Sequence, residues 1–219
     1  MQLKKEMPLM AFLLLMFISS TVLYRYVPEK IPTHWNAKGE IDGYSGKFLG
    51  LFLLPIIASI LYILFLVLPA IMPYRNNIEK IEGKFYWLKA IMLAFFAVLY
   101  LASILSSFGI QINIIYVMMP SLAVIFYYIG YLMKYTKRNF FIGIRTPWTL
   151  VSDKSWDMTH KKASVLFRLY GLLIMTTLFF PSYAFLFLLI SLIPLILYLV
   201  VYSYLIYRGE KKKAGRSFR

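Results

Sequence analysis

Two long stretches of this sequence contain no charged residue, and they dominate its hydrophobic pattern. One runs from Ala90 to Met133 and the other from Leu169 to Tyr207. A helix needs about 20 apolar residues to cross a bilayer, so each stretch is roughly long enough for two crossings. Gly109 interrupts the first stretch and Pro181 the second, and both residue types commonly end helices. Each stretch therefore predicts two transmembrane helices joined by a short link.

Two further apolar segments raise the expected number of transmembrane helices to six. The predicted spans cover residues 7–26, 48–72, 87–108, 112–133, 165–180 and 183–207. Several contain proline, which is tolerated inside a membrane because neighbouring helices can satisfy the freed carbonyl groups. The expected fold class is all-α, a polytopic membrane protein built as a six-transmembrane-helix bundle.

The composition agrees with this interpretation. Hydrophobic residues make up 61% of the 219 positions, against roughly 45–50% in a typical soluble domain. A soluble fold of this size has too little interior to bury so much apolar surface. The chain contains no cysteine, which excludes thiol nucleophiles, disulfides and cysteine-ligated metals.

The basic residues predict the orientation in the membrane. All but four of the 24 lysines and arginines fall on one side of the six-span arrangement, and the positive-inside rule assigns that side to the cytoplasm. The exceptions surround the first loop and are Arg25, Lys30, Lys38 and Lys47. Both termini are therefore expected to be cytoplasmic. The net charge of +15 is interpreted as a sign of topology, and direct nucleic-acid binding is not expected.

Two loops have room for specific recognition, and they define the expected domain organisation. Residues 1–80 are predicted to hold the first two spans with an extracytoplasmic loop at about 27–47. Residues 81–219 are predicted to hold the other four spans, a cytoplasmic loop at about 134–164 and a basic C-terminal tail.

The outer loop allows two interpretations. His34, Glu40 and Asp42 carry side chains that ordinarily bind metal ions, but they lack a recognisable zinc-site spacing. Alternatively, Trp35 and Tyr44 anchor the loop at the lipid headgroups while the polar residues face water. The second interpretation is favoured, so neither a metal ion nor another cofactor is expected.

The cytoplasmic loop contains a helical pattern. Ser152 is placed to cap a helix whose first turn contains Asp153, where a carboxylate suits the helix dipole. One face of this helix is then formed by Trp156, His160, Ala163 and Phe167. The periodicity predicts an amphipathic helix at the membrane interface that continues into the fifth span.

This loop also allows two interpretations. In the first, it is an interfacial elbow held by Trp148 and Trp156, with Arg145 on lipid phosphates. In the second, it is a docking surface for a cytoplasmic partner or an anionic ligand. The residue pattern alone favours the first, because aromatic and basic residues are common at this depth of the membrane.

The spans themselves are predicted to lack catalytic groups. All nine acidic residues and both histidines are assigned to loops or helix ends. Ion-coupled carriers usually need an ionisable group within the membrane, and intramembrane proteases need a buried metal site or a general base. No catalytic residues are assigned, and the protein is not expected to be an enzyme.

Two motifs carry a resemblance to known families. The first is Pro28-x-x-Ile-Pro-x-His-Trp-x-x-x-Gly-x-x-Asp-Gly-Tyr44, which resembles a short outer-loop domain of unknown function. The second is Ile142-Gly-Ile-Arg-Thr-Pro-Trp-Thr-Leu150, followed by Trp156 and by Thr159-His160-Lys161. It resembles the signature of the SdpI family, and the two motifs occur in the expected order on a six-span chain.

The resemblance implies a function. The type member of the family protects its cell against a secreted, membrane-active toxin peptide and captures a winged-helix repressor of the ArsR type at the plasma membrane, so the resemblance implies the same two roles here. The partners implied are membrane lipids, the toxin and this repressor. The implied toxin contacts are Pro32, His34, Trp35, Gly39, Asp42 and Tyr44. The implied repressor-docking residues are Gly143, Arg145, Thr146, Pro147, Trp148, Thr149, Trp156 and His160.

Two alternatives remain open from the sequence. Prolines in four of the spans could break helices around a midplane site, as in a small-solute transporter or a lipid-handling protein. A purely structural accessory role is the other.

Overall fold

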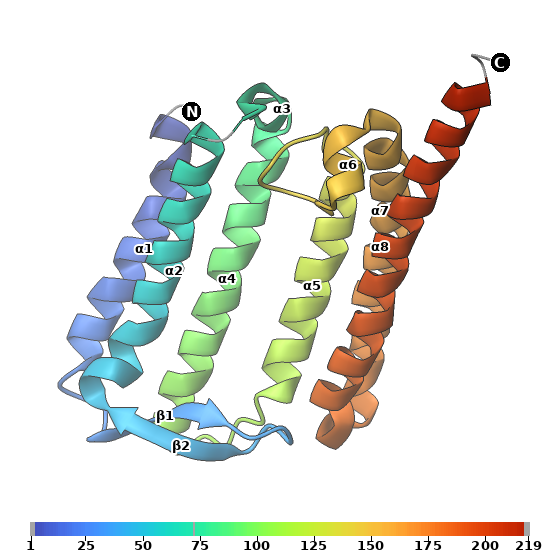
Figure 1. The fold of residues 1–219 in the computed structure, drawn as a ribbon. Helices are drawn as coiled ribbons and strands as arrows, with labels where there is room; N and C mark the ends of the chain where they lie inside the picture. Colours follow the sequence, from blue (N-terminus) through green and yellow to red (C-terminus); the bar gives the residue numbers. More distant parts are fainter. Residues whose placement is uncertain (1–2, 72, 217–219) are drawn as a thin grey trace. The chain divides into compact units, whose positions relative to one another are not determined.

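The computed structural model describes residues 3–71 and 73–216, and most of these residues are helical (Figure 1). The helices are α1 (Leu3–Leu23), α2 (Lys47–Ile71), α3 (Arg75–Glu79), α4 (Glu82–Ser107), α5 (Ile115–Met133), α6 (Pro147–Val151), α7 (Asp153–Met175) and α8 (Ala184–Arg216). Two short 3-10 helices, Thr176–Phe179 and Pro181–Tyr183, connect α7 to α8. The last residues of the predicted basic tail, 217–219, lie outside the described part of the chain.

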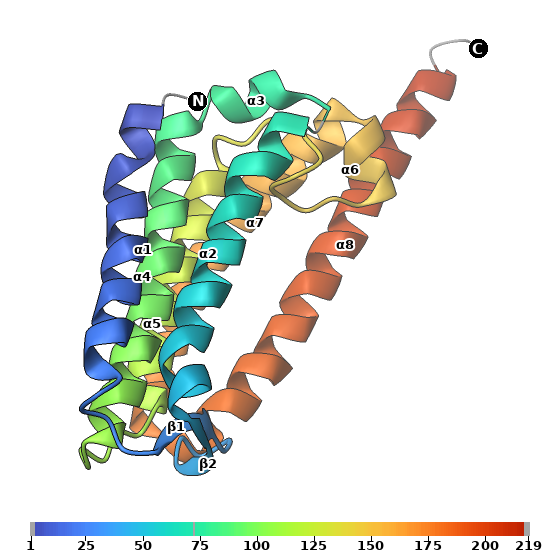
Figure 2. The ribbon, with the colours of Figure 1, turned by 90° about the vertical axis from the view of Figure 1, so that its left-hand side faces the viewer.

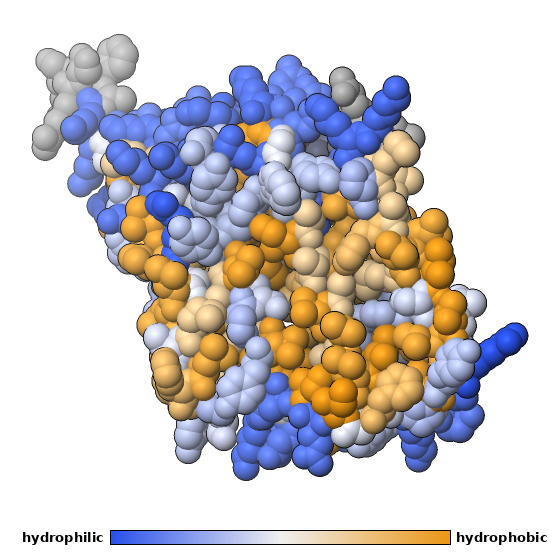
Figure 3. All heavy atoms as spheres, turned by 180° about the vertical axis from the view of Figure 1, so that it is seen from behind, coloured by the Kyte–Doolittle hydropathy of each residue, from blue (hydrophilic) through white to orange (hydrophobic). Residues whose placement is uncertain are grey.

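Six helices among the described residues are long and apolar enough to cross a membrane, which confirms the predicted number of spans. They are α1, α2, α4, α5, α7 with the following 3-10 turn, and α8. Many of their large apolar side chains are exposed, including Leu186, Ile190 and Leu197 on α8. Hydrophobic side chains spread over the helical surface on the face shown in Figure 3, and hydrophilic ones gather toward the helix ends. An apolar surface of this extent is suited to lipid rather than water.

The outer loop differs from the all-α expectation because it contains a β-hairpin. Strands β1 (Lys30–Trp35) and β2 (Ile41–Gly46) pair antiparallel in a two-stranded sheet between α1 and α2 (Figure 2). The register shifts after Pro32, which lacks the N–H that a regular ladder requires. Two short, irregular strands that include a proline give little alternating pattern in the sequence.

Helix α7 confirms the helix that the sequence pattern placed after Ser152 and continued into the fifth span. Helix α7 starts at Asp153 and continues without interruption through the position, residue 165, at which the span was expected to begin. Its N-terminus confirms the predicted cap, because the backbone N–H of Ser155 donates to the Ser152 hydroxyl at 3.0 Å. The predicted interfacial segment and the fifth span are therefore one continuous helix.

The chain forms two compact units, each assembled from three segments. Unit 1 comprises Met1–Phe65, Lys89–Leu122 and Ile174–Leu186. Unit 2 comprises Leu66–Leu88, Ala123–Leu173 and Phe187–Arg219.

Each unit has interior contacts that join helices distant in sequence. In unit 1, the buried Ser20 hydroxyl on α1 donates to the Leu51 carbonyl of α2 at 2.8 Å and lies 2.7 Å from the Tyr100 hydroxyl of α4. Such hydroxyl contacts commonly hold membrane helices together. In unit 2, an apolar core is formed by Met133, Ala163, Phe167 and Leu199.

Candidate functional site

The hairpin of strands β1 and β2 is closed by a turn that Asn36 organises. The Asn36 side-chain oxygen accepts from the backbone N–H groups of Lys38 and Glu40, at 2.9 and 3.1 Å. Gly39 has a φ of +82°, a conformation that glycine adopts far more readily than other residues. These contacts give the hairpin an ordered tip.

This tip is attached to the start of α5 through Asn113, a residue that the sequence analysis did not single out. The Asn113 amide donates to the Lys38 carbonyl at 2.9 Å, and the Ile114 N–H donates to the Gly39 carbonyl at 3.0 Å. A side chain at Gly39 would place its Cβ 2.0 Å from the Asn113 side-chain oxygen. Gly39 therefore shapes the hairpin and its attachment, which is a different task from contacting a ligand directly.

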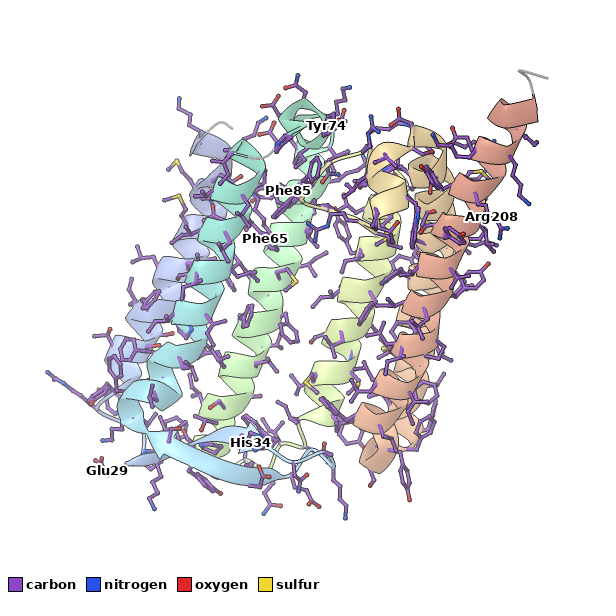
Figure 4. The ribbon with its side chains drawn as sticks, in the orientation of Figure 1. Glu29, His34, Phe65, Tyr74, Phe85 and Arg208 are labelled. Atoms are coloured by element: carbon purple, nitrogen blue, oxygen red, sulfur yellow. The ribbon has the colours of Figure 1, made fainter. Side chains whose placement is uncertain are left out.

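The six implied toxin-contact residues fall into two groups. Pro32 and Gly39 are buried, and the Pro32 carbonyl accepts a hydrogen bond from the Ser103 hydroxyl. His34, Trp35, Asp42 and Tyr44 are at least partly exposed. His34 lies on β1, at the same end of unit 1 as Glu29, which precedes that strand (Figure 4). The four accessible side chains are the ones that a ligand can reach.

The three side chains considered for a metal site do not converge. His34 Nδ1 lies 2.5 Å from Asp42 Oδ1, whereas the Glu40 carboxylate accepts from the Asn36 amide at 3.0 Å. Within the described residues, no group of three or more histidine, cysteine or acidic side chains is placed to hold a metal ion. The His34–Asp42 pair is an exposed polar contact across the hairpin.

Replacing Gly39 by alanine is expected to detach the hairpin tip. The change forces a non-glycine residue into a positive-φ conformation, at a cost of about 1–3 kcal/mol, and its Cβ meets Asn113. We expect faster tryptic cleavage after Lys38 in detergent-solubilised protein. Gly46→Ala is the matched control, because a Cβ at Gly46 meets nothing within 4 Å. Equal cleavage rates in the two variants would contradict this role of Gly39.

Residues 134–152 connect α5 to α7 and contain most of the second motif, and we call them the motif loop. This loop begins with a turn held by Asn139. This residue is fully buried, and its side-chain oxygen accepts from the N–H groups of Phe141 and Ile142, both at 2.7 Å. Its amide donates to the Lys137 and Ile142 carbonyls, at 2.8 and 3.0 Å. Asparagine commonly organises turns in this way, although the sequence analysis did not assign it a role.

Aromatic contacts hold the same turn against α4 and the segment before α3. Phe141 packs edge-on against Phe85 of α4, and Phe140 stacks on Tyr74, with ring centroids 5.7 and 5.9 Å apart. Figure 4 labels Tyr74 and Phe85 on these elements. The loop is therefore packed against other segments of unit 2 and is not a free linker.

The Thr146-Pro147-Trp148-Thr149 part of the motif starts helix α6. Thr146 is the N-cap and Pro147 occupies the first turn, where its missing N–H has no helical partner to lose. The Thr146 hydroxyl accepts from the Thr149 N–H at 3.2 Å, and the Thr149 hydroxyl accepts from the Thr146 N–H at 2.9 Å. The Thr146 hydroxyl also lies 3.0 Å from that of Ser203 on α8. Both threonines are thus structural.

Gly143 and His160 form the centre of the motif. The Ile144 N–H donates to His160 Nε2 at 3.1 Å, and His160 Nδ1 lies 2.8 Å from the Trp156 carbonyl. Gly143 has a φ of +124°, and a Cβ there would lie 2.2 Å from His160 Nε2. The Trp156 indole N–H in turn donates to the Thr136 carbonyl at 2.8 Å. A glycine, a histidine and a tryptophan are needed here because these groups meet directly.

This geometry corrects the interpretation of Trp156 as a membrane anchor. Its side chain has no exposed surface and stacks on His160 with ring centroids 3.9 Å apart. The predicted helical face of Trp156, His160, Ala163 and Phe167 exists, but it is buried inside unit 2. An interfacial elbow would leave this tryptophan at the lipid headgroups.

Three of the implied docking residues remain accessible. Arg145 and Pro147 are exposed, and Trp148 is partly exposed and packs against Tyr204 with ring centroids 5.1 Å apart. One Arg145 guanidinium N–H donates to the Phe140 carbonyl at 2.6 Å. Since a guanidinium has five N–H donors, this contact orients Arg145 and leaves it able to bind an anionic group.

Unit 1 also contains a buried ion pair that the sequence analysis missed. Lys89 of α4 donates to the Glu6 carboxylate of α1, and the two residues are 2% and 4% exposed. The Tyr62 hydroxyl of α2 donates to the same carboxylate at 2.8 Å. The sequence analysis assigned Glu6 to a helix end and counted Lys89 among the cytoplasmic basic residues, and it did not predict that the two would pair. The pair joins residues more than 80 positions apart, and no local pattern indicates such a contact.

Comparisons with known proteins agree with the resemblance carried by the two motifs. The family model described as a domain of unknown function, DUF1648, matches residues 11–59, and that of the SdpI/YfhL protein family matches residues 136–204. The chain is 28% identical to the immunity protein SdpI of Bacillus subtilis (strain 168), over 97% of this chain and 99% of that protein. No solved structure gives a significant match. Together with the six apolar helices, these matches identify a multi-pass membrane protein.

Proposed function

Because residues 136–204 form a region of the SdpI/YfhL protein family, we propose that the chain is a plasma-membrane immunity protein. It protects its cell against a secreted, membrane-active peptide toxin. It also captures a cytoplasmic winged-helix repressor of the ArsR type while toxin is present. It has no catalytic role in this proposal. The observation that carries the proposal is that both recognisable motifs lie within matched regions of a chain similar to an immunity protein along nearly its whole length.

The proposed topology places the two motifs on opposite sides of the membrane. Three candidate spans, α2, α4 and α5, lie between the hairpin and the motif loop along the chain. An odd number of crossings moves the chain from one side to the other. The basic residues favour a cytoplasmic motif loop and cytoplasmic termini, which leaves the hairpin outside, where a secreted peptide arrives.

The accessible residues of each motif then have separate tasks. On the outer side, His34, Trp35, Asp42 and Tyr44 offer two aromatic rings and one polar pair to the toxin. On the cytoplasmic side, Arg145 and Trp148 offer a cation beside an aromatic ring. Arginine, tryptophan and tyrosine contribute strongly to many protein interfaces, so both surfaces have suitable chemistry for binding a protein or peptide.

The direct test is membrane potential in toxin-sensitive bacteria challenged with an Sdp-type toxin peptide. Cells that express the chain are expected to keep their potential, and cells that carry an empty vector are expected to lose it. Membrane insertion is confirmed in parallel by immunoblotting of membrane fractions. Equal collapse in both strains, with insertion intact, would reject immunity to that peptide.

The topology can be tested by cysteine labelling, because the chain contains no cysteine. We expect a Lys38→Cys variant to react with a membrane-impermeant maleimide in intact cells, since this residue is exposed at the hairpin tip. A Lys154→Cys variant, exposed at the start of α7, is expected to react only after permeabilisation. Labelling of Lys154→Cys in intact cells would place the start of α7 outside the cell and refute the proposed orientation.

The transporter alternative was based on prolines that could break the helices, and the described helices continue through these prolines. Midplane sites in many transporters are built from discontinuous helices, and prolines were the reason to expect them here. Helices α5 and α8 nevertheless continue through Pro120 and Pro194, and α2 continues through Pro55. Solute-dependent flux in proteoliposomes across a broad panel of solutes would revive this alternative.

A further inference from the structure

Unit 1 contains an apolar cavity beneath the outer hairpin. Its volume is about 470 Å³, within the range of roughly 300–1,000 Å³ that is typical of ligand sites. The hairpin, α2, α4, α5 and the start of α8 all contribute to its wall. The side chains that matter below are Trp35, Leu53, Leu99, Met118 and Phe185. The outer motif and the cavity therefore share one wall.

The polar groups around this cavity are mostly engaged within the hairpin. The Thr33 hydroxyl lies 2.9 Å from that of Ser45, and His34 pairs with Asp42. Asn36 holds the turn and the Glu40 carboxylate. These side chains shape the edge of the cavity, and each already has a hydrogen-bond partner within the hairpin.

Trp35 is different because its buried indole N–H has no hydrogen-bond partner among the described residues. An indole N–H can only donate, and buried donors in folded proteins nearly always have an acceptor. An apolar cavity whose wall includes an unused donor is suited to a ligand that combines an apolar group with a nearby acceptor.

We propose that this cavity binds an apolar side chain of the peptide toxin, while a backbone carbonyl of the same peptide accepts from the Trp35 N–H. The inference rests on the proposed immunity function and identifies the cavity as the place where the toxin binds. A peptide presents a carbonyl beside every side chain, so the two requirements are met together. A lipid acyl chain carries its ester carbonyl only at one end.

The test measures binding of a fluorescently labelled Sdp-type toxin peptide to the full chain in lipid nanodiscs. Leu53→Trp adds a ring to a residue that lines the cavity and is expected to weaken binding at least tenfold. Ile56→Trp is the matched control. The two residues belong to the same helix, with exposures of 39% for Leu53 and 37% for Ile56, but Ile56 is absent from the cavity wall. We expect this control to bind within twofold of the parent chain.

A second variant isolates the hydrogen bond. Trp35→Phe keeps an aromatic ring and removes the N–H, so we expect binding to weaken about three- to tenfold, the effect of losing one hydrogen bond. Unchanged binding in this variant would overturn the assigned carbonyl contact. Nanodiscs with brominated acyl chains provide the comparison with lipid. The chain contains four tryptophans, so the Trp35 signal is taken as the quenching that the Trp35→Phe variant loses. Quenching of that signal that the peptide does not relieve would identify lipid as the occupant and overturn the proposal.

The outcome for the cavity is separable from the outcome for immunity. If Leu53→Trp and Ile56→Trp bind the peptide equally while the parent chain still protects cells, the cavity proposal fails and the immunity function stands. If the parent chain neither binds the peptide nor protects cells, both fail. Loss of binding and protection in Leu53→Trp alone supports both.

Discussion

Replacing Lys89 by methionine is expected to lower the free energy of unfolding by about 3–5 kcal/mol, the usual cost of leaving one member of a buried ion pair without its partner. Lys89 and Glu6 are almost completely buried in unit 1 and contact each other directly. Methionine preserves much of the length and apolar character of the lysine side chain. The loss therefore reflects the uncompensated Glu6 carboxylate more than a cavity.

The prediction is checked by denaturant unfolding of the chain in detergent micelles, followed by circular dichroism. The double variant Glu6→Gln/Lys89→Met is expected to recover most of the lost stability, because it removes both charges together. Lys137→Met is the control, because it removes an ion pair that is exposed and not buried. Lys137 and Asp157 pair at 3.1 Å with side chains 60% and 54% exposed, and exposed pairs contribute at most about 1 kcal/mol. A Lys89→Met variant no less stable than this control would refute the structural importance of the buried pair.

This ion pair illustrates where sequence patterns stop being informative. Lys89 is one of many basic residues on the predicted cytoplasmic side, and the positive-inside rule uses it only as a charge count. Its pairing with Glu6 depends on how α1 and α4 pack, which hydrophobic periodicity does not specify. The spans, by contrast, depend on local composition alone, and all six were predicted.

Elements shorter than a span were predicted less well for a related reason. Helices α3 and α6 have five residues each, too few to give a 3.6-residue periodicity that can be distinguished from chance. The strands of the hairpin have six residues each, and their burial pattern alternates only in β2. The capping residue Ser152 was predicted correctly because a cap depends on side chains within three residues.

The two motifs were located correctly, but sequence could not divide their residues by task. Gly39 and Gly143 have positive φ values and lie against Asn113 and His160 respectively. These contacts join positions that are 74 and 17 residues apart, so no local sequence pattern indicates them. Of the fourteen residues of the two implied sites, the structure leaves a smaller group accessible, and Arg145 is the arginine in that group.

In the proposed function, replacing Arg145 by alanine is expected to weaken repressor capture at least 30-fold without changing the fold of unit 2. Buried arginine contacts at the centre of interfaces are often worth 2 kcal/mol or more, which corresponds to a factor of this size. The side chain is exposed and its described hydrogen bond reaches only the Phe140 carbonyl. Capture is measured as toxin-dependent movement of the repressor to the membrane fraction, with proteolysis of the motif loop as a check on its structure.

Two variants make this result interpretable. Arg208→Ala removes the same charge from an exposed position on α8 in the same unit (Figure 4), and capture is expected to stay within twofold of the parent chain. Gly143→Ala forces a Cβ against His160, so capture should be lost together with protection of the loop from proteases. Loss of capture in Arg145→Ala with an intact loop separates direct contact from collapse of the motif. Normal capture in Arg145→Ala would exclude the Arg145 guanidinium from the interface and leave Trp148 and its neighbour Tyr204 to be tested next.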